Sequence, residues 1–143
     1  YGSNFVNGHS SIWWDKNSHL KPIPLKKNQH IELPWENSAG NIYMSILDCV
    51  KFCQIYLKTF NNKENLLELS TAKYLTKANK YDYGYGWDVD KKNNIISHGG
   101  MWQAMTTSFL FIPNKDIGII ICYNIYDDRQ SNKIKKVFLD NFL

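Results

Sequence analysis

The stretch YGYGWDVDKKNNIISHGGMWQAMTTSFLFIPNKDIGIIICYN, residues 83–124, decides the fold that the sequence predicts. Apolar and aromatic residues alternate with polar ones, and glycine, asparagine and proline separate the runs, which is typical of short strands joined by tight turns. The predicted strands are Tyr83–Val89, Asn94–His98, Thr106–Ile112 and Ile117–Asn124. Four consecutive strands with short connections predict an antiparallel meander.

Helical periodicity flanks this block on both sides. Ser45 and Asp48 form a capping-box pattern, so a helix is expected from Ser45 to about Thr59, and a shorter one across Glu64–Tyr74. The first helix carries an apolar stripe of Ile46, Val50, Cys53, Leu57 and Phe60. A C-terminal helix is expected with one apolar face of Ile134, Val137, Phe138 and Phe142. The sequence therefore predicts one α+β domain over residues 1–143, with helices flanking an antiparallel sheet.

Length, charge and termini limit the functional classes to which the protein can belong. The chain has 143 residues and a net charge of +4, which comes from scattered lysines and one arginine, Arg129. Nucleic-acid-binding surfaces usually cluster their cations, so no nucleic-acid partner is expected. No apolar run reaches the length of a membrane span. The chain opens on YGSNFVNGHS, without an initiator Met or a signal-like start, and is expected to be a piece of a longer protein.

The cysteines and the N-terminal aromatics favour structural roles. Cys49 and Cys53 lie four apart on the first predicted helix, and Cys122 lies on the last strand. One cysteine pair without a nearby Cys or His partner is typical of core packing, so we expect no metal site, no structural disulfide and no cofactor. The first forty residues are rich in loop formers. There Trp13-Trp14 could form a ligand-stacking shelf, although an aromatic pair more often packs into the core of its own domain.

Three blocks of the sequence resemble the serine β-lactamase and penicillin-binding-protein family, in its class C-like branch. They are NFVNGH at Asn4–His9, NSAGNIYMSILDCVKFCQIYL at Asn37–Leu57, and residues 83–124. The first resembles the family's Asn-x-Ala-x-Gly-Tyr segment, and the second its Ala-Gly-Gly-Leu-x-Ser-Thr-x-x-Asp-Leu-x-x-Phe segment. The third has Tyr-Gly-x-Gly-Trp, then His-Gly-Gly, then two hairpin strands. The resemblance covers nearly all of this chain and implies the C-terminal portion of a β-lactamase/transpeptidase-like fold.

The resemblance also implies a site. The family attacks carbonyls through a Ser-x-x-Lys helix, a Tyr-x-Asn or Ser-x-Asn motif, and a Lys-Thr-Gly or His-x-Gly strand, which His98-Gly99-Gly100 matches. On this reading His98 lies beside the proton relay, and the N–H of Met101 donates to the oxyanion. Gly99 and Gly100 leave room for the substrate, and Trp102 joins them as a substrate-binding residue.

The other two motifs of the family do not match. Ser70-Thr71-Ala72-Lys73 has the Ser-x-x-Lys spelling, yet Ser70 precedes His98 by fewer than thirty residues, whereas the family's nucleophile lies far upstream of its His-Gly-Gly strand. We therefore expect Ser70 to be a surface residue or a helix-start cap. Neither Tyr-x-Asn nor Ser-x-Asn occurs in the chain.

The chain is accordingly expected to be the C-terminal segment of a serine hydrolase that acts on an amide, an ester or a β-lactam, and to be inactive alone. Its expected partners are a small-molecule or peptide substrate and, on an apolar surface, the N-terminal part of the domain or a second copy. The family resemblance points to an exported or periplasmic location, and the free cysteines leave a cytosolic one open.

Two alternatives stay open. The chain could be a non-catalytic module that binds a peptide or peptidoglycan fragment along the His98 strand by strand addition. Alternatively, Ser70 and Lys73 could form a true dyad in an unrelated amidase-like arrangement.

Overall fold

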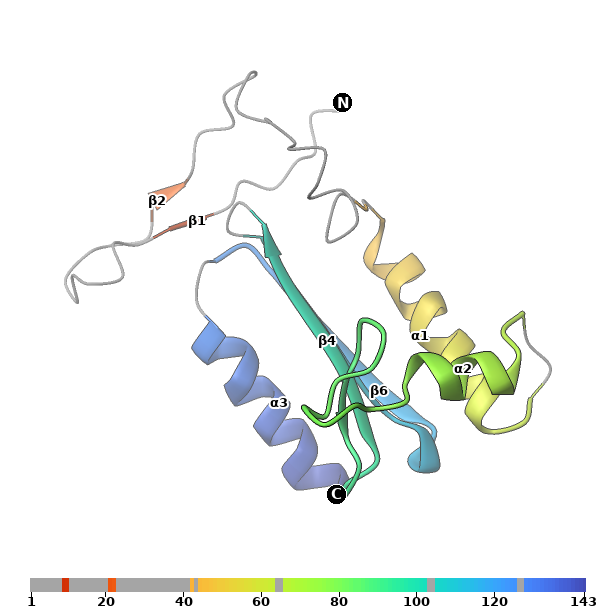
Figure 1. Cartoon of the computed structure of the whole chain (residues 1–143). Helices are drawn as coiled ribbons and strands as arrows, with labels where there is room; N and C mark the ends of the chain where they lie inside the picture. Colours follow the sequence, from red (N-terminus) through yellow and green to blue (C-terminus); the bar gives the residue numbers. More distant parts are fainter. Residues whose placement is uncertain are drawn as a thin grey trace.

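The structure, a computed structural model, describes residues 9–10, 21–22, 42, 44–63, 66–102, 105–125 and 128–143. A four-stranded antiparallel sheet lies between two long helices, α1 (Ile46–Phe60) on one face and α3 (Asp128–Phe142) on the other (Figure 1). A short helix, α2 (Leu69–Leu75), lies beside α1. Near the N-terminus, β1 (His9–Ser10) pairs with β2 (Lys21–Pro22). Trp13-Trp14 lies outside the described residues. The predicted α+β class is confirmed.

The sheet is the predicted meander. Its order is β3-β4-β5-β6, with all neighbours antiparallel. The strands are β3 (Asp88–Asp90), β4 (Ile95–Trp102), β5 (Met105–Ile112) and β6 (Ile117–Tyr123), with a 3₁₀ turn η2 (Pro113–Lys115) between the last two. The second strand is longer than predicted, because it continues through His98 to Trp102. The glycine pair therefore lies inside a strand.

The prediction of a strand over Tyr83–Val89 is wrong for most of its length. Tyr83 makes only an isolated bridge to Asp88, and the residues between them form a loop. A Cβ on Gly84 would lie 2.5 Å from the carbonyl oxygen of Leu75, and Gly86 has a φ of +86°. Both glycines therefore serve a tight loop against the end of α2, where a residue with a side chain would clash or be strained.

Helix α1 begins as the sequence predicts. Ser45 is its N-cap, and its Oγ accepts from the backbone N–H of Asp48 at 3.2 Å. The helix ends at Phe60, one residue beyond the prediction. Only part of the predicted apolar stripe is buried: Cys53 and Leu57 join the core, whereas Ile46 is 52% exposed. The start of the stripe thus stays on the surface, because no described element covers it.

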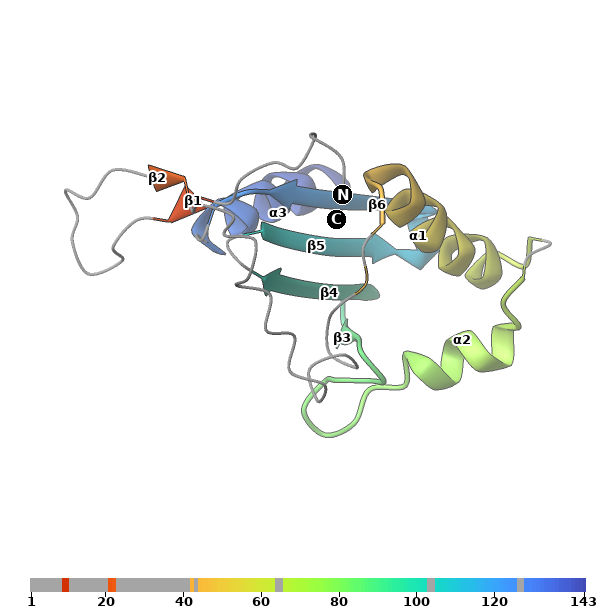
Figure 2. The same ribbon diagram turned by 90° about the horizontal axis from the view of Figure 1, so that it is seen from above.

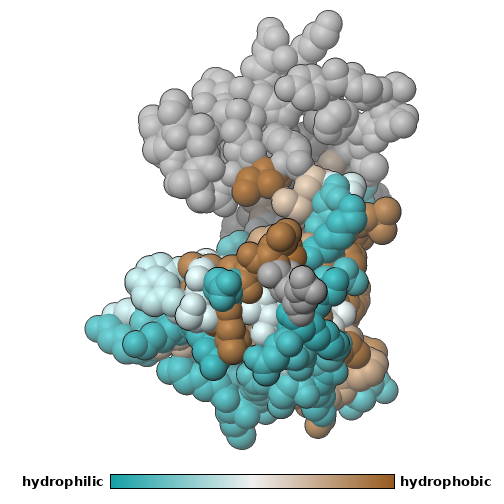
Figure 3. All heavy atoms as spheres, turned by 90° about the vertical axis from the view of Figure 1, so that its right-hand side faces the viewer, coloured by the Kyte–Doolittle hydropathy of each residue, from teal (hydrophilic) through white to brown (hydrophobic). Residues whose placement is uncertain are grey.

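Figure 3 views the side of the molecule on which α1 lies, and apolar spheres are visible there among hydrophilic ones. At and before the start of α1, the exposed large apolar side chains are Ile42, Met44, Ile46, Leu47 and Val50. Among the described residues, no helix is long and apolar enough to cross a membrane.

The two faces of the sheet bury different clusters, as period-two alternation along the strands requires. On the α1 face the core consists of Cys53, Tyr56, Leu57, Ala72, Trp87, Ile96 and Phe111. On the α3 face, Ile95, Leu110 and Ile112 pack with Phe138 and Leu139, which confirms that the C-terminal helix lies across the sheet. Its predicted apolar face is only partly right, because Val137 is 63% exposed and Leu139 packs in its place.

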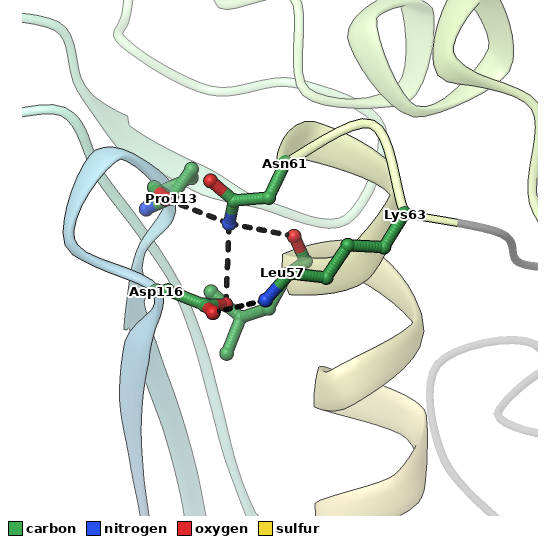
Figure 4. A network of polar contacts seen from close by, with 5 residues as sticks. All are labelled: Leu57, Asn61, Lys63, Pro113 and Asp116. Carbon is green, nitrogen blue, oxygen red and sulfur yellow. Dashed lines mark hydrogen bonds and ion pairs between the residues drawn. The ribbon is translucent and has the colours of Figure 1, made fainter.

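Asn61 fastens the end of α1 to the turn between β5 and β6. Its side-chain amide donates to the carbonyl oxygens of Leu57 at 2.9 Å and Pro113 at 3.1 Å, and to the carboxylate of Asp116 at 3.2 Å (Figure 4). Lys63 forms an ion pair with the same carboxylate. These contacts hold α1 at one end of the sheet and so set the position of its inward face.

Helix α2 is shorter than the predicted Glu64–Tyr74. It begins at Leu69, with Glu68 at the N-cap position, and Glu64 lies outside the described residues. The hydroxyl of Thr59 donates to the carbonyl oxygen of Leu67 at 3.0 Å. This contact links the chain before α2 to α1, and the same hydroxyl lies 2.8 Å from the carbonyl oxygen of Ile55.

Candidate functional site

Strand β4 carries the predicted site residues in one unbroken ladder. His98 pairs with Phe109, Gly99 with Ser108, and Gly100 with Thr107 on β5. Side chains alternate along a strand, so His98 lies on the α1 face with Ile96, and Gly99 and Met101 take the α3 side. The strand thus places the His-Gly-Gly motif across both faces of the sheet.

On its other side, β4 has no neighbouring strand among the described residues from His98 onward. Strand β3 pairs only with residues 95–97 of β4, and in the part of the chain that the structure describes no other strand continues the ladder there. The backbone N–H of Val89 donates to the carbonyl oxygen of Asp82 at 2.8 Å, so the N–H and C=O of Val89 point away from β4. The backbone groups of Asp88 and Asp90 therefore point toward β4, where these residues pair with Ser97 and Ile95.

The same alternation fixes the direction of the remaining backbone groups. Ser97 turns its N–H and C=O toward β3, so Gly99 and Met101, two and four residues further on, turn theirs to the same side. No described strand lies at that edge beyond Ser97. The N–H groups of His98 and Gly100 point the other way, into the ladder with β5. Gly99 and Met101 therefore turn their backbone groups to an edge at which the described part of the chain places no neighbouring strand.

Space around the two glycines is ample. A Cβ on Gly100 would meet no atom within 4 Å, and a Cβ on Gly99 would meet only Ser108 Oγ and the Thr107 carbonyl oxygen, both at 3.7 Å. The Ser108 hydroxyl is buried and has no hydrogen-bond partner among the described residues. The two glycines therefore leave room for a ligand above both faces of β4 at this point.

His98 is half-buried beside an aromatic cluster on the α1 face. Its ring lies 6.2 Å from that of Trp87, with the two planes at 77°. Trp87 is only 5% exposed and contacts three further rings, those of Phe52, Tyr56 and Phe111. Sequence reasoning missed this contact, although the Tyr-Gly-x-Gly-Trp pattern contains the residue.

Comparison with known protein families assigns the chain to one of them. A family model described as Beta-lactamase matches residues 7–139. The chain belongs to the Beta-lactamase family. Comparisons with curated proteins and with solved structures each found no match. The resemblance seen in the sequence is thus confirmed at the level of the family.

Within this Beta-lactamase-family chain, Ser70 and Lys73 do not approach the His98 strand. Both residues are exposed on α2. Figures 1 and 2 show α2 toward the end of the sheet at which β4 begins, whereas Met101 lies near the end of β4. Ser70 is in the first turn of the helix, after the N-cap residue Glu68, so it is a surface residue as predicted and not the cap itself.

The two buried thiols of the described residues are not activated nucleophiles. Cys49, Cys53 and Cys122 are free, and the first two are buried. Burial raises the pKa of the Cys53 thiol to about 12, with a further contribution from Cys49. Burial, and then Cys122, raises the pKa of Cys49 as well. Both buried thiols are therefore protonated at neutral pH.

Other features of the described surface do not include His98 or Met101. No group of three or more His, Cys, Asp or Glu residues in the described part of the chain could hold a metal ion. An open hollow of about 500 Å³ runs along β3, between Tyr81 and Lys92, and His98 and Met101 do not line it. Trp102 ends β4 opposite Met105, but its side chain lies outside the described residues, so its role in binding substrate stays a prediction.

Proposed function

We propose that this chain forms one wall of an acyl-transfer site in a serine hydrolase of the Beta-lactamase family, with the substrate lying along the open edge of β4. The observation that carries the proposal is the outward direction of the backbone groups of Gly99 and Met101, where β3 no longer pairs with β4. An unpaired strand edge binds an extended amide or acyl chain through main-chain hydrogen bonds.

Each residue of the motif has a role in this proposal. The N–H of Met101 donates to the oxygen that becomes negative when a carbonyl at the edge is attacked. One such donor is worth about 3 kcal/mol of transition-state stabilisation. The imidazole of His98 supplies a further donor on the α1 face, beside the attacked carbonyl. Gly99 and Gly100, which leave open space on the two faces, admit the substrate backbone.

The nucleophile and its base come from a different polypeptide segment. Support for this part comes from the exposed position of Ser70 and Lys73 on α2 and from the lack of a Tyr-x-Asn or Ser-x-Asn motif in the sequence. The exposed apolar side chains at the start of α1, such as Ile46 and Leu47, favour contact with the segment that carries the nucleophile. We expect the chain alone to form no acyl-enzyme.

Intact-mass spectrometry tests the catalytic assignment. The chain is incubated with a reactive penicillin and, separately, with a fluorophosphonate, and Ser70→Ala serves as the matched control. The expected result is no adduct on either protein. An adduct that forms on the native chain and is absent from Ser70→Ala would show that Ser70 is a working nucleophile, and the proposal would have to be abandoned.

The same open edge also favours a second candidate, a non-catalytic module that binds a peptide or a peptidoglycan fragment by strand addition. The two candidates differ in what accompanies this chain. Ser-x-x-Lys and Tyr-x-Asn motifs in the adjoining coding sequence would support the hydrolase. A full-length product that binds the peptide without being acylated would support the module.

A further inference from the structure

We propose that Trp87 is a positioning residue for His98, and that the loop between α2 and β3 holds it in place. This inference rests on the proposed function, because it matters for a ligand only if His98 borders the ligand edge of β4. The proposal concerns the orientation of the imidazole and assigns Trp87 no contact with the reacting atoms.

The contact between the two rings has the geometry of an attractive aromatic pair. Their centroids are 6.2 Å apart and their planes are nearly perpendicular, at 77°. Such edge-to-face pairs are favoured at centroid separations of 4.5–7 Å and contribute beyond the area that they bury. One ring nitrogen of His98 must face the edge of β4 to act on a ligand, so a neighbour that fixes the ring plane also fixes that direction.

Trp87 is itself fixed, which a positioning residue requires. Its ring stacks on Phe52 at 6.1 Å, with planes 14° apart, and meets Tyr56 at 5.0 Å and Phe111 at 5.3 Å edge to face. Phe52 and Tyr56 belong to α1, and Phe111 belongs to β5. Contacts from a helix and a strand together leave the indole few alternative rotamers.

The backbone of the loop is equally constrained. The N–H of Gly84 donates to the carbonyl oxygen of Trp87 at 2.7 Å, and the N–H of Tyr85 donates to that of Leu75 at 2.8 Å. Gly84 packs too closely on Leu75 for any side chain, and Gly86 has a positive φ. The end of α2 thus fixes the backbone of the loop, and the loop fixes the position of Trp87. Trp87 in turn fixes the plane of the His98 ring.

The test is NMR of the His98 imidazole in the full chain, with Trp87→Leu and Trp87→Phe as variants. Tyr85→Phe is the matched control, because it changes the same loop but removes only an exposed hydroxyl that pairs with Tyr74. In Trp87→Leu, the ring-proton shifts of His98 should move to the values of a histidine that lacks the ring current of an adjacent indole. Trp87→Phe should retain part of the ring-current effect, and Tyr85→Phe should match the native chain.

Ligand binding is measured in the same samples with an N-acyl-D-alanyl-D-alanine peptide. Trp87→Leu should weaken peptide binding by about two- to tenfold, which corresponds to the free energy of one aromatic pair. Trp87→Phe should retain most of the affinity of the native chain. Unchanged His98 shifts in a folded Trp87→Leu chain would overturn the inference. If Trp87→Leu does not fold, the shifts in Trp87→Phe decide instead: no change from the native values would equally overturn it.

The two proposals fail in different ways. If the native chain does not bind the peptide at Gly99 and Met101, the proposed function fails at this edge, while the His98 shifts still report whether Trp87 contacts the ring. If the peptide binds and Trp87→Leu leaves the affinity unchanged, the positioning role fails and the proposed function stands, because a change in the His98 shifts alone reports only the loss of the indole ring current.

Discussion

Proline substitution at neighbouring positions of β4 should have opposite consequences, because the direction of the backbone N–H alternates along the strand. Gly100 lies in the ladder with Thr107 and turns its N–H toward β5. Met101 turns its N–H to the open edge beyond β3. We therefore expect Gly100→Pro to destabilise the fold strongly and Met101→Pro to be tolerated.

The magnitudes follow from what each proline removes. At position 100 the ring deletes a ladder hydrogen bond, worth about 1 kcal/mol, and presses on the neighbouring strand, at a cost of about 1–3 kcal/mol. The sum is a loss of about 2–4 kcal/mol relative to Gly100→Ala, whose added Cβ meets only open space. At position 101 no ladder bond is lost, so Met101→Pro should lie within about 1 kcal/mol of Met101→Ala.

Urea unfolding followed by far-UV circular dichroism measures these differences. The two alanine variants remove the effect of the side chain, so the comparison isolates the backbone N–H. Equal losses at the two positions, or a larger loss at Met101, would show that the N–H of Met101 is not free. In that case the open-edge interpretation of β4 would be refuted.

Other parts of the structure make independent predictions. Gly84→Ala should lower the free energy of unfolding by about 1–3 kcal/mol, because its Cβ would lie 2.5 Å from a carbonyl oxygen; an unchanged urea midpoint would contradict this. Iodoacetamide should alkylate exposed Cys122 first, and buried Cys53, whose pKa is about 12, only on unfolding; peptide mapping that finds Cys53 modified at the same rate would be inconsistent with the burial. Hydrogen bonds from the Asn93 side chain, and then from its backbone, lower the pKa of the Asp90 carboxyl group in the folded state. The Asp90 carboxylate therefore stabilises the fold at a pH above its pKa in the unfolded state, and this stabilisation is lost as the pH falls below about 4. The fall in melting temperature on acidification should accordingly be smaller in Asp90→Asn than in the native chain, and identical acid profiles would count against that role.

Features of the fold that depend on local chemistry were predictable from the sequence. The cap at Ser45, the alternation of β5 and the turn after Asp90 follow from neighbouring residues, and each lies where the pattern puts it. Features that depend on distant contacts were not predictable. The glycines at 84 and 86 match a strand pattern, and only their approach to Leu75 makes them part of a loop.

The candidate site shows the same division. The His-Gly-Gly pattern, together with the flanking blocks that resemble the family, selected His98 to Met101 as candidates. Which of these backbone groups face an edge without a described strand depends on where β3 ends, and residue spacing does not reveal that point. The contact of His98 with Trp87 likewise requires α1 and β5 to hold the indole from both sides, which no local pattern encodes.

The most direct test of the account is amide NMR of the full chain during titration with the N-acyl-D-alanyl-D-alanine peptide. The account predicts saturable shifts of the Gly99 and Met101 amides, much smaller shifts of the inward Gly100 amide, and loss of binding in Met101→Pro. Shifts that centre on the hollow along β3, or none at Gly99 and Met101 at saturating peptide, would contradict the claim that the open edge of β4 is the ligand site.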